Sequence, residues 1–277
     1  MKIILSRKGF DLSCAGFPSP IIDDTLLSMP IPEDTSEWHE IPKNAVRYRD
    51  LSYSGRTYDQ IIEGLRPKCR NPERGINFDI CHLDPDIRRG IRLNPIDGWK
   101  PAFGQTGNAL SILEKAGVEK GDLFLFFGLF RKAEERDGSI KFIRNERPKH
   151  IIYGYMQIDK ILKRPEDMAK YNWHPHAISD NYDSDNNALF LPSDELSSLS
   201  SPLPGHGVLS YREDRVLTIP GKSAAVWKEH YFLRPENIIG NWNYHSKDCG
   251  LYYNWQWQEL ILNGNKKAQE WVMGLIR

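Results

Sequence analysis

One carboxylate, Asp11, follows closely on a short apolar run, Ile3 to Ser6, that is typical of a buried strand. Arg7 and Lys8 lie between the two, so a phosphate group bound by these cations would bring its sugar close to the carboxylate. A carboxylate placed there can stabilise a positively charged sugar in a transition state and can orient a water molecule. The residue also has a structural interpretation, because aspartates in loops mostly accept hydrogen bonds from nearby backbone N–H groups.

A second candidate carboxylate, Asp84, lies in a run from Phe78 to Asp86 that alternates like a strand and ends at a proline turn. If the strand continues to this point, Asp84 and His82 share one of its faces. Asp84 and Asp86 could also divide acid and base roles, because two close carboxylates push their pKa values apart. A turn whose carboxylates pair with the neighbouring arginines accounts for these residues equally well.

Neither a metal site nor a cofactor motif is apparent in the sequence. His174 and His176 would share a face of an extended segment, but a metal site needs a third or fourth ligand, and no spacing supplies one. We therefore predict no metal, and partly buried histidines beside Trp173 are the structural alternative. The segment Gly104–Gly107 could hold a phosphate at a helix start, with Thr106 as its N-cap. It lacks the Gly-Lys-Ser/Thr of a P-loop, and we expect no organic cofactor.

The positive charges are local rather than general. Lys plus Arg equals Asp plus Glu at 37 each, so binding of nucleic acid would require a basic surface on one part of the molecule. The cations that we expect to contact phosphates are Arg7, Lys8, Arg66, Lys68, Arg70, Arg74, Arg88, Arg89 and Arg92.

The elements that would position these residues indicate an α+β fold. We expect a single domain over residues 1–277, with a mixed, largely antiparallel central sheet, a few helices and long ordered loops. Residues 12–50 are rich in proline and are predicted to form a long excursion without regular structure. Strands are expected at Ile3–Ser6, Leu123–Phe130, Ile151–Ile158 and Ala188–Leu191, with a hairpin over Gly207–Thr218; helices are expected after the capping box Thr57–Gln60, after Thr106 and over Lys266–Ile276.

Composition indicates a folded protein of the cytoplasm. Hydrophobic residues make up 40% and charged residues 27% of the 277 residues. The four cysteines, Cys14, Cys69, Cys81 and Cys249, form no C-x-x-C pair and are expected to be free thiols in a reducing compartment. No apolar run approaches the roughly 20 residues of a membrane span, and the N-terminus does not resemble a signal peptide. We expect neither a membrane association nor an obligate protein partner.

A series of motifs along the chain resembles the nucleotide modification associated domain family, third type. The resemblance covers essentially the whole chain, and its N-terminal and Phe-Phe-Gly motifs are the more specific ones. The chain departs from the family pattern at Leu12 and Cys14, where small residues are expected, and it lacks a glycine before Gln269-Glu270. The motifs that carry the resemblance are Met1–Asp11, Pro18–Ile21, Met29–Pro32, His82–Asp86, Phe103–Gln105, Gly121–Gly128, Tyr153–Tyr155 and His174–His176.

This resemblance implies an enzyme that acts on DNA carrying modified bases. It suggests a DNA glycosylase that flips a hypermodified, cytosine-type base out of phage DNA and excises it in anti-phage defence. Asp11 and Asp84 would be catalytic, and the base or sugar pocket would be formed by Phe10, His82, Gln105, Phe127, His174 and His176. Two alternatives stay open: a transferase that makes or elaborates a base modification, and a non-enzymatic reader of modified DNA.

Overall fold

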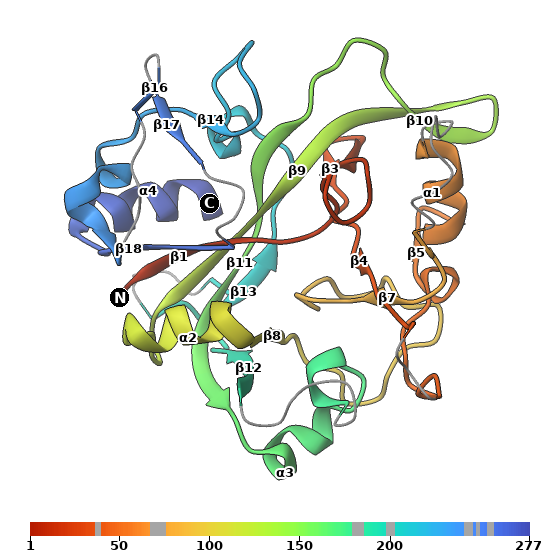
Figure 1. Cartoon of the computed structure of the whole chain (residues 1–277), viewed down its shortest axis with the longest axis horizontal. Coiled ribbons are helices and arrows are strands. Elements are labelled where there is room, and N and C mark those ends of the chain that lie inside the picture. The colour runs from red at the N-terminus through yellow and green to blue at the C-terminus, as the bar shows by residue number, and fades with distance from the viewer. Residues whose placement is uncertain are drawn as a thin grey trace.

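One large sheet organises the part of the chain that the computed structural model describes, residues 1–36, 40–66, 76–178, 186–197, 203–240, 246–247, 250–253 and 258–277 (Figure 1). Its central path runs in the order β15-β18-β1-β9-β11-β12-β8. The strands of this path are β1 (Ile3–Arg7), β8 (Phe103–Thr106), β9 (Leu123–Arg136), β11 (Lys149–Leu162), β12 (Asn187–Pro192), β15 (Ile238–Ile239) and β18 (Glu259–Leu262).

Four more strands join this sheet beside its central path, and the sheet is mixed because β9 pairs in parallel with both β1 and β2. All its other pairings are antiparallel. The additional strands are β2 (Ser19–Ile22), β3 (Thr25–Leu26), β10 (Ser139–Phe142) and β13 (His206–Val208). Smaller pairings join β4 (Ile31–Pro32) to β7 (Cys81–His82), β5 (Ser52–Tyr53) to β6 (Arg56–Thr57), and β17 (Gly250–Tyr252) to both β14 (Val226–Trp227) and β16 (Ser246–Lys247).

Alternation along β9 gives the sheet two apolar faces. Leu123, Leu125 and Phe127 pack in a core with α4 (Lys266–Ile276), whereas Phe124 and Phe126 pack in a second core with α2 (Gly107–Lys115). Side chains of successive strand residues point to opposite faces, so one continuous apolar run serves both cores. The two helices therefore cover opposite faces of the sheet (Figure 1).

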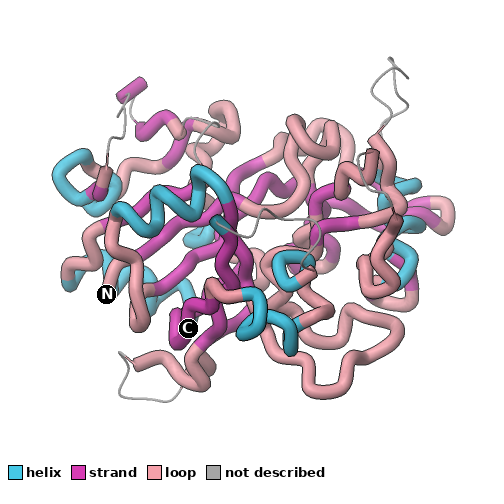
Figure 2. The backbone as a smooth tube through the Cα atoms, turned by 60° about the horizontal axis from the view of Figure 1, so that its bottom comes forward, coloured by secondary structure: helices cyan, strands magenta, loops and turns pink. Residues whose placement is uncertain are grey.

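A third core lies beside the sheet and is formed largely by the N-terminal part of the chain. Phe10, Phe17 and Tyr48 pack there with α1 (Tyr58–Leu65) and with Ile140 of β10. The remaining helix, α3 (Pro165–Met168), is a single turn whose Met168 packs in a fourth, smaller cluster. Figure 2 shows how much of the chain outside the main sheet consists of loops.

The structure confirms the fold class and most of the expected elements. The strands at β1, β9, β11 and β12 and the helices α1, α2 and α4 lie where the patterns predict them. In the capping box of α1, the backbone N–H of Thr57 donates to Gln60 at 3.0 Å. Thr106 is the N-cap residue of α2, but its hydroxyl donates to the Asn186 carbonyl at 2.7 Å instead of capping the helix.

Three expectations about local structure are wrong. Residues 12–50 contain the short strands β2, β3 and β4, because β9 extends far enough to pair with β2. Gly207–Thr218 forms no hairpin, since β13 pairs with β11 and Glu213–Arg215 is a 3-10 turn. The alternating run before Asp84 forms a strand only over Cys81–His82, with one isolated bridge from Ile80 to Arg47.

The sequence predicted free cysteine thiols and no membrane-spanning segment. Cys14 and Cys81 are free, whereas Cys69 and Cys249 lie outside the described residues. Within the described ranges, no helix has the length and apolar character needed to cross a bilayer.

Candidate functional site

A polar cavity of about 560 Å³ opens where the end of β1, the strands β7, β8 and β18, and the start of α2 meet. This volume lies within the roughly 300–1,000 Å³ range of small-molecule and cofactor sites. The lining includes seven residues singled out by the sequence: Arg7, Lys8, Asp11, His82, Asp84, Gln105 and His176. Glu33, Thr106, Asn108 and Glu259 also line it.

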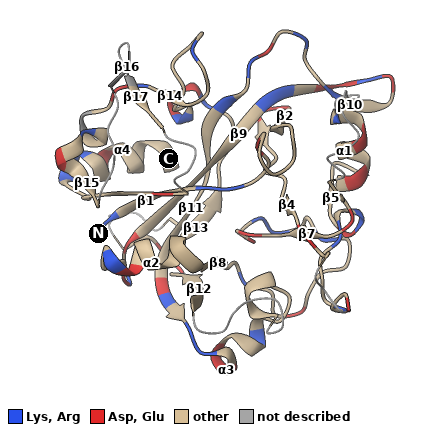
Figure 3. Cartoon of the chain, viewed as in Figure 1, with Lys and Arg blue, Asp and Glu red and all other residues tan. Residues whose placement is uncertain are grey.

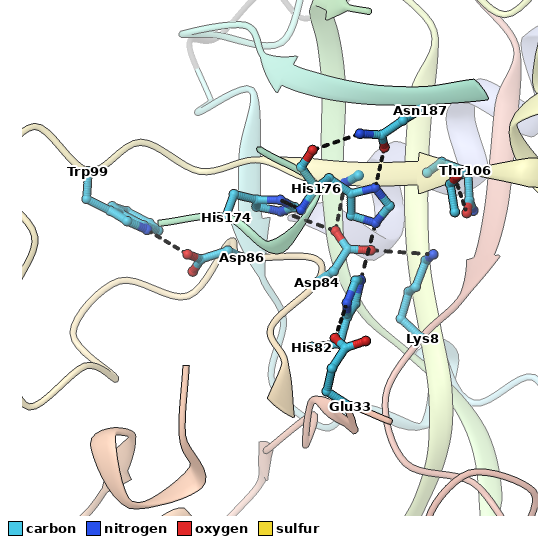
Figure 4. Close-up of polar contacts among 12 residues, drawn as sticks. Lys8, Glu33, His82, Asp84, Asp86, Trp99, Thr106, His174, His176 and Asn187 are labelled. Atoms are coloured by element: carbon cyan, nitrogen blue, oxygen red, sulfur yellow. Dashed lines mark hydrogen bonds and ion pairs between the residues drawn. The ribbon is translucent and has the colours of Figure 1, made fainter. Parts of the chain in front are cut away.

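Asp84 is held as a carboxylate at the wall of this cavity. Its Oδ1 accepts a hydrogen bond from the backbone N–H of Gly104 at 2.7 Å and lies 3.3 Å from Nε2 of His174. Its Oδ2 lies 3.6 Å from Nζ of Lys8, whose side chain is itself largely buried (Figure 4). Burial alone would raise the pKa of Asp84, but the Lys8 charge and the histidine contacts outweigh it and hold the pKa well below its usual value.

Glu259 is a second buried carboxyl group in the same wall, and its pKa is shifted in the opposite direction to that of Asp84. The antiparallel register of β1 and β18 places it opposite Ser6, whose hydroxyl donates to Oε1 at 2.8 Å. Nε2 of Gln105 donates to the same oxygen at 2.6 Å. Burial raises the pKa of Glu259, and the Asp84 charge adds to this effect, although Lys8 and the two hydrogen bonds oppose it. Among the described residues, Oε2 of Glu259 has no hydrogen-bond partner.

Two histidines meet Asp84 at the inner end of the cavity. Nε2 of His82 and Nε2 of His176 lie 3.2 Å apart, and the potential ligand atoms of these two residues and Asp84 all lie within 4.8 Å of one another. The other ring nitrogen of His82 contacts Oε2 of Glu33 at 2.8 Å. Burial lowers the pKa of His176 to about 3, which keeps its ring neutral at physiological pH.

Gly104 leaves the space that the His176 ring occupies. A Cβ atom at this position would lie 2.1 Å from Cδ2 and 2.2 Å from Cγ of that ring, too close for any side chain. The backbone of Gly104 also donates the 2.7 Å hydrogen bond to Asp84. Gly104 of β8 therefore helps to orient both Asp84 and His176.

We expect Gly104→Ala to displace His176 and to destabilise the protein by about 1–3 kcal/mol, the usual cost of overpacking a filled space. The measurement is urea denaturation combined with an NMR spectrum of the histidine rings. Gly274→Ala is the matched control, because no atom lies within 4 Å of its added Cβ in helix α4. An unchanged His176 resonance in a stable Gly104→Ala protein would contradict this positioning role.

Asp11 lies at the cavity but already has several partners. Its Oδ1 accepts hydrogen bonds from the backbone N–H groups of Ser13 and Cys14 at 2.7 and 2.9 Å, and from the Ser13 hydroxyl at 2.6 Å. Its Oδ2 lies 3.4 Å from Nη1 of Arg7. Burial opposes these contacts, which together lower the pKa of Asp11. The geometry therefore combines the loop-capping role with a charge at the cavity, and catalysis by Asp11 stays a prediction.

Three residues predicted for the base or sugar pocket do not line this cavity. Phe10 packs edge-on against Phe17 in the third core, with ring centroids 5.2 Å apart. Phe127 is buried against Trp227 on the α4 face of the sheet. Both rings are fully buried in these cores, so the structure brings neither Phe10 nor Phe127 to the cavity. His174 lies behind Asp84 and contacts it from outside the cavity.

The expected phosphate-binding cations are dispersed. Figure 3 shows Lys and Arg spread over many elements and mixed with Asp and Glu. Arg7 and Lys8 border the cavity, Arg66 and Arg89 are exposed, and Arg88 donates to the Leu26 carbonyl at 2.9 Å. Lys68, Arg70 and Arg74 lie outside the described residues.

Arg92 has a structural partner. Its Nη2 donates to the buried Asp86 at 2.6 Å, and Nε1 of Trp99 donates to the same carboxylate oxygen at 2.9 Å. Arg92 therefore compensates a buried charge, and this corrects the interpretation of Asp86 as a partner of Asp84 in catalysis.

Sequence reasoning missed Glu259, Glu33 and Asn187. The signal for Glu259 was a single acidic residue at the start of an otherwise apolar run, Glu259–Leu262. A lone charge in such a strand is buried with it, and buried charges are rare unless they are functional or paired. Glu33 and Asn187 have no such signal, because only the tertiary fold brings them to the histidines.

The protein is of the α+β class, and a cavity opens at the edge of its large mixed sheet. Asp84 and Glu259 line this cavity, and their pKa values are shifted in opposite directions. The chain belongs to the nucleotide modification associated domain 3 family, which it matches over residues 2–274. This match confirms the family resemblance and associates the protein with nucleotide modification. No curated protein and no solved structure matches the chain.

Proposed function

We propose that this protein is a DNA glycosylase that hydrolyses the N-glycosidic bond of a hypermodified, cytosine-type base in phage DNA. This activity would serve anti-phage defence. The observation that supports this most is the joint presence of Asp84 and Glu259 in one cavity. Asp84 forms an ion pair with the buried Lys8, whereas Glu259 forms no ion pair among the described residues and its pKa is raised by burial, as acid–base chemistry at a glycosidic bond requires.

The two carboxylates would divide the hydrolysis between them. Asp84, kept anionic by Lys8, orients a water molecule and accepts its proton as the water oxygen bonds to C1′ of the sugar. The bond between C1′ and the base nitrogen breaks, and its electron pair leaves with the base. Glu259, which retains its proton because burial disfavours its charged form, donates that proton to the departing base. Asp11 could stabilise the positive charge on the sugar.

The start of helix α2 supports a nucleotide ligand in the same cavity. Thr106, Asn108 and Ala109 line it, so the first backbone N–H groups of a nine-residue helix lie at its border. Such N–H groups and the positive end of the helix dipole favour a phosphate. Gln105 lines the cavity next to Glu259 and would contact the edge of a base.

The test is incubation of the protein with phage DNAs that carry different cytosine modifications. Abasic sites are then cleaved with alkali, and the released bases are identified by mass spectrometry. Release of a free modified base together with strand cleavage supports the proposal. Base conversion without release would indicate a transferase, and binding without any product would indicate a reader; either result contradicts the glycosylase.

We expect the exposed cations to contribute to DNA binding and the buried ones to stability. Reversing Arg66 and Arg89 together should weaken binding and lower the slope of log K against log salt by about 1–2 if both contact phosphates. Fluorescence anisotropy at several salt concentrations measures this. Lys120→Gln is the control, because this residue is 75% exposed but already pairs with Asp159 at 2.6 Å and lies outside the cavity. An unchanged slope in the double variant would show that these two arginines bind no phosphate.

A further inference from the structure

The hydrogen bonds of His82 and His176 orient both rings toward one point. Nδ1 of His176 lies 2.7 Å from Oδ1 of Asn187, while Nδ2 of Asn187 donates to the His176 carbonyl at 2.8 Å. The second bond fixes the orientation of the amide, so Oδ1 must accept a proton from Nδ1. Nδ1 of His82 contacts the Glu33 carboxylate at 2.8 Å and donates to it in the same way. Both rings therefore present Nε2 toward each other.

The spacing of these groups is compatible with ligands around an ion. Two nitrogens 3.2 Å apart that each bind an ion at about 2.1 Å subtend an angle of about 100° at it, as adjacent ligands of a metal do. An Asp84 oxygen completes a set of two imidazoles and one carboxylate. Glu33 and Asn187 supply the outer hydrogen bonds that usually fix the tautomer of metal-binding histidines (Figure 4).

We propose that His82, Asp84 and His176 bind one divalent first-row transition metal ion at the inner end of the cavity. Imidazole suits iron, cobalt and zinc, whereas magnesium and calcium prefer sites made entirely of oxygen. Three ligands on one side of the ion leave positions toward the cavity, which all three residues line. This inference replaces the expectation of no metal, which rested on spacing alone: His82 and His176 are 94 residues apart in the sequence.

Nε2 of His82 and Nε2 of His176 lie 3.2 Å apart, and a metal ion between them would also gain the Asp84 carboxylate. Lys8, 3.6 Å from the other side of Asp84, limits the total negative charge and leaves the site suited to a single divalent ion.

A role for the ion in base release rests on the proposed function, whereas binding of the ion does not. An ion at this position would hold and acidify the water that Asp84 otherwise orients alone. The hydrolysis stays balanced, because the water proton passes to the oxygen of Asp84 that does not bind the ion, the water oxygen bonds to C1′, and the base takes its proton from Glu259.

The test is titration of the chelator-treated full-length protein with Co²⁺, followed by visible absorption. We expect one Co²⁺ per chain, displaced by Zn²⁺ and not by millimolar Mg²⁺. Affinity should fall at least 100-fold in His176→Ala and Asp84→Asn. It should fall by about 10–100-fold in Glu33→Gln, which removes only an outer hydrogen bond. His206→Ala, a histidine outside the cavity, should bind as the native protein does, and thermal melts establish that each variant is folded.

Absence of stoichiometric Co²⁺ binding overturns the site, and so does equal affinity in the native protein and in Glu33→Gln and Asp84→Asn. Glu33→Gln carries the test if the other variants do not fold, because its side chain is partly exposed and keeps its size. Base release is measured separately, with chelator and with added Zn²⁺. Release in chelator without Co²⁺ binding leaves the glycosylase intact, whereas Co²⁺ binding without release under any condition overturns the glycosylase alone.

Discussion

Glu259→Gln should abolish most base release while making the protein more stable at neutral pH. Glutamine keeps the oxygen that accepts from Ser6 and Gln105 at 2.8 and 2.6 Å, but it has no proton to give to a leaving base. Loss of a general acid typically costs about 10²–10⁴-fold in rate. Single-turnover base release at pH 7 measures this loss, and DNA affinity should change little because the acid acts in the transition state.

The stability gain has a defined dependence on pH. The pKa of Glu259 is raised in the folded protein, so the unfolded chain releases this proton first as the pH rises above its ordinary value near 4.5. The native protein is thereby destabilised with rising pH until its folded pKa is passed, by up to about 1.4 kcal/mol per pH unit. The Glu259→Gln variant has no titratable group at this position in either state. The difference in free energy of unfolding between the variant and the native protein should therefore grow from pH 5 to pH 7.

Urea denaturation at pH 5, 6 and 7 checks this dependence. Glu114→Gln is the control, since its side chain is 43% exposed on α2 and should show no growing advantage. A constant difference between Glu259→Gln and the native protein would mean that Glu259 is ionised in the folded state. Full base release by the well-folded variant would remove Glu259 from the mechanism.

Local patterns were sufficient to predict the elements but not the site. The run Leu123–Phe130 identifies β9 because an apolar segment of that length must be buried on both faces. The capping residues of α1 act on their own helix, so they are visible in any short window of sequence. The spacing predicted that His82 and Asp84 share a strand face; the strand ends at His82, yet the turn that follows still brings their side chains within 4.8 Å.

The remaining contacts of the site depend on strand order and register. Glu259 meets Ser6 only because β18 pairs with β1 in one particular register, over 253 residues of sequence separation. His176 reaches His82 from a 3-10 turn that no periodicity predicts. Phe10 and Phe127 had the residue type for base stacking, but residue type does not reveal which face of the sheet a ring will occupy.

Asp84→Asn should reduce base release by about 10²–10⁴-fold, and it should also destabilise the protein. The amide cannot accept a proton from water, and it leaves the buried ammonium of Lys8 without the carboxylate that lies 3.6 Å away. Removing one member of a buried ion pair costs about 3–5 kcal/mol. Activity is therefore measured per folded molecule, by single-turnover base release below the onset of thermal unfolding.

Two comparisons separate chemistry from stability. Asp86→Asn is a matched control, since Asp86 is equally buried and paired with Arg92 but lies outside the cavity. It should lose comparable stability and keep the native rate of base release. Lys8→Met added to Asp84→Asn should restore much of the stability by removing the orphaned charge, and it should restore none of the rate.

Asp11→Asn keeps its loop-capping oxygen, so any loss of rate there reports the charge of Asp11 at the sugar. A native rate in folded Asp84→Asn, with a slow Asp11→Asn, would transfer the catalytic role from Asp84 to Asp11.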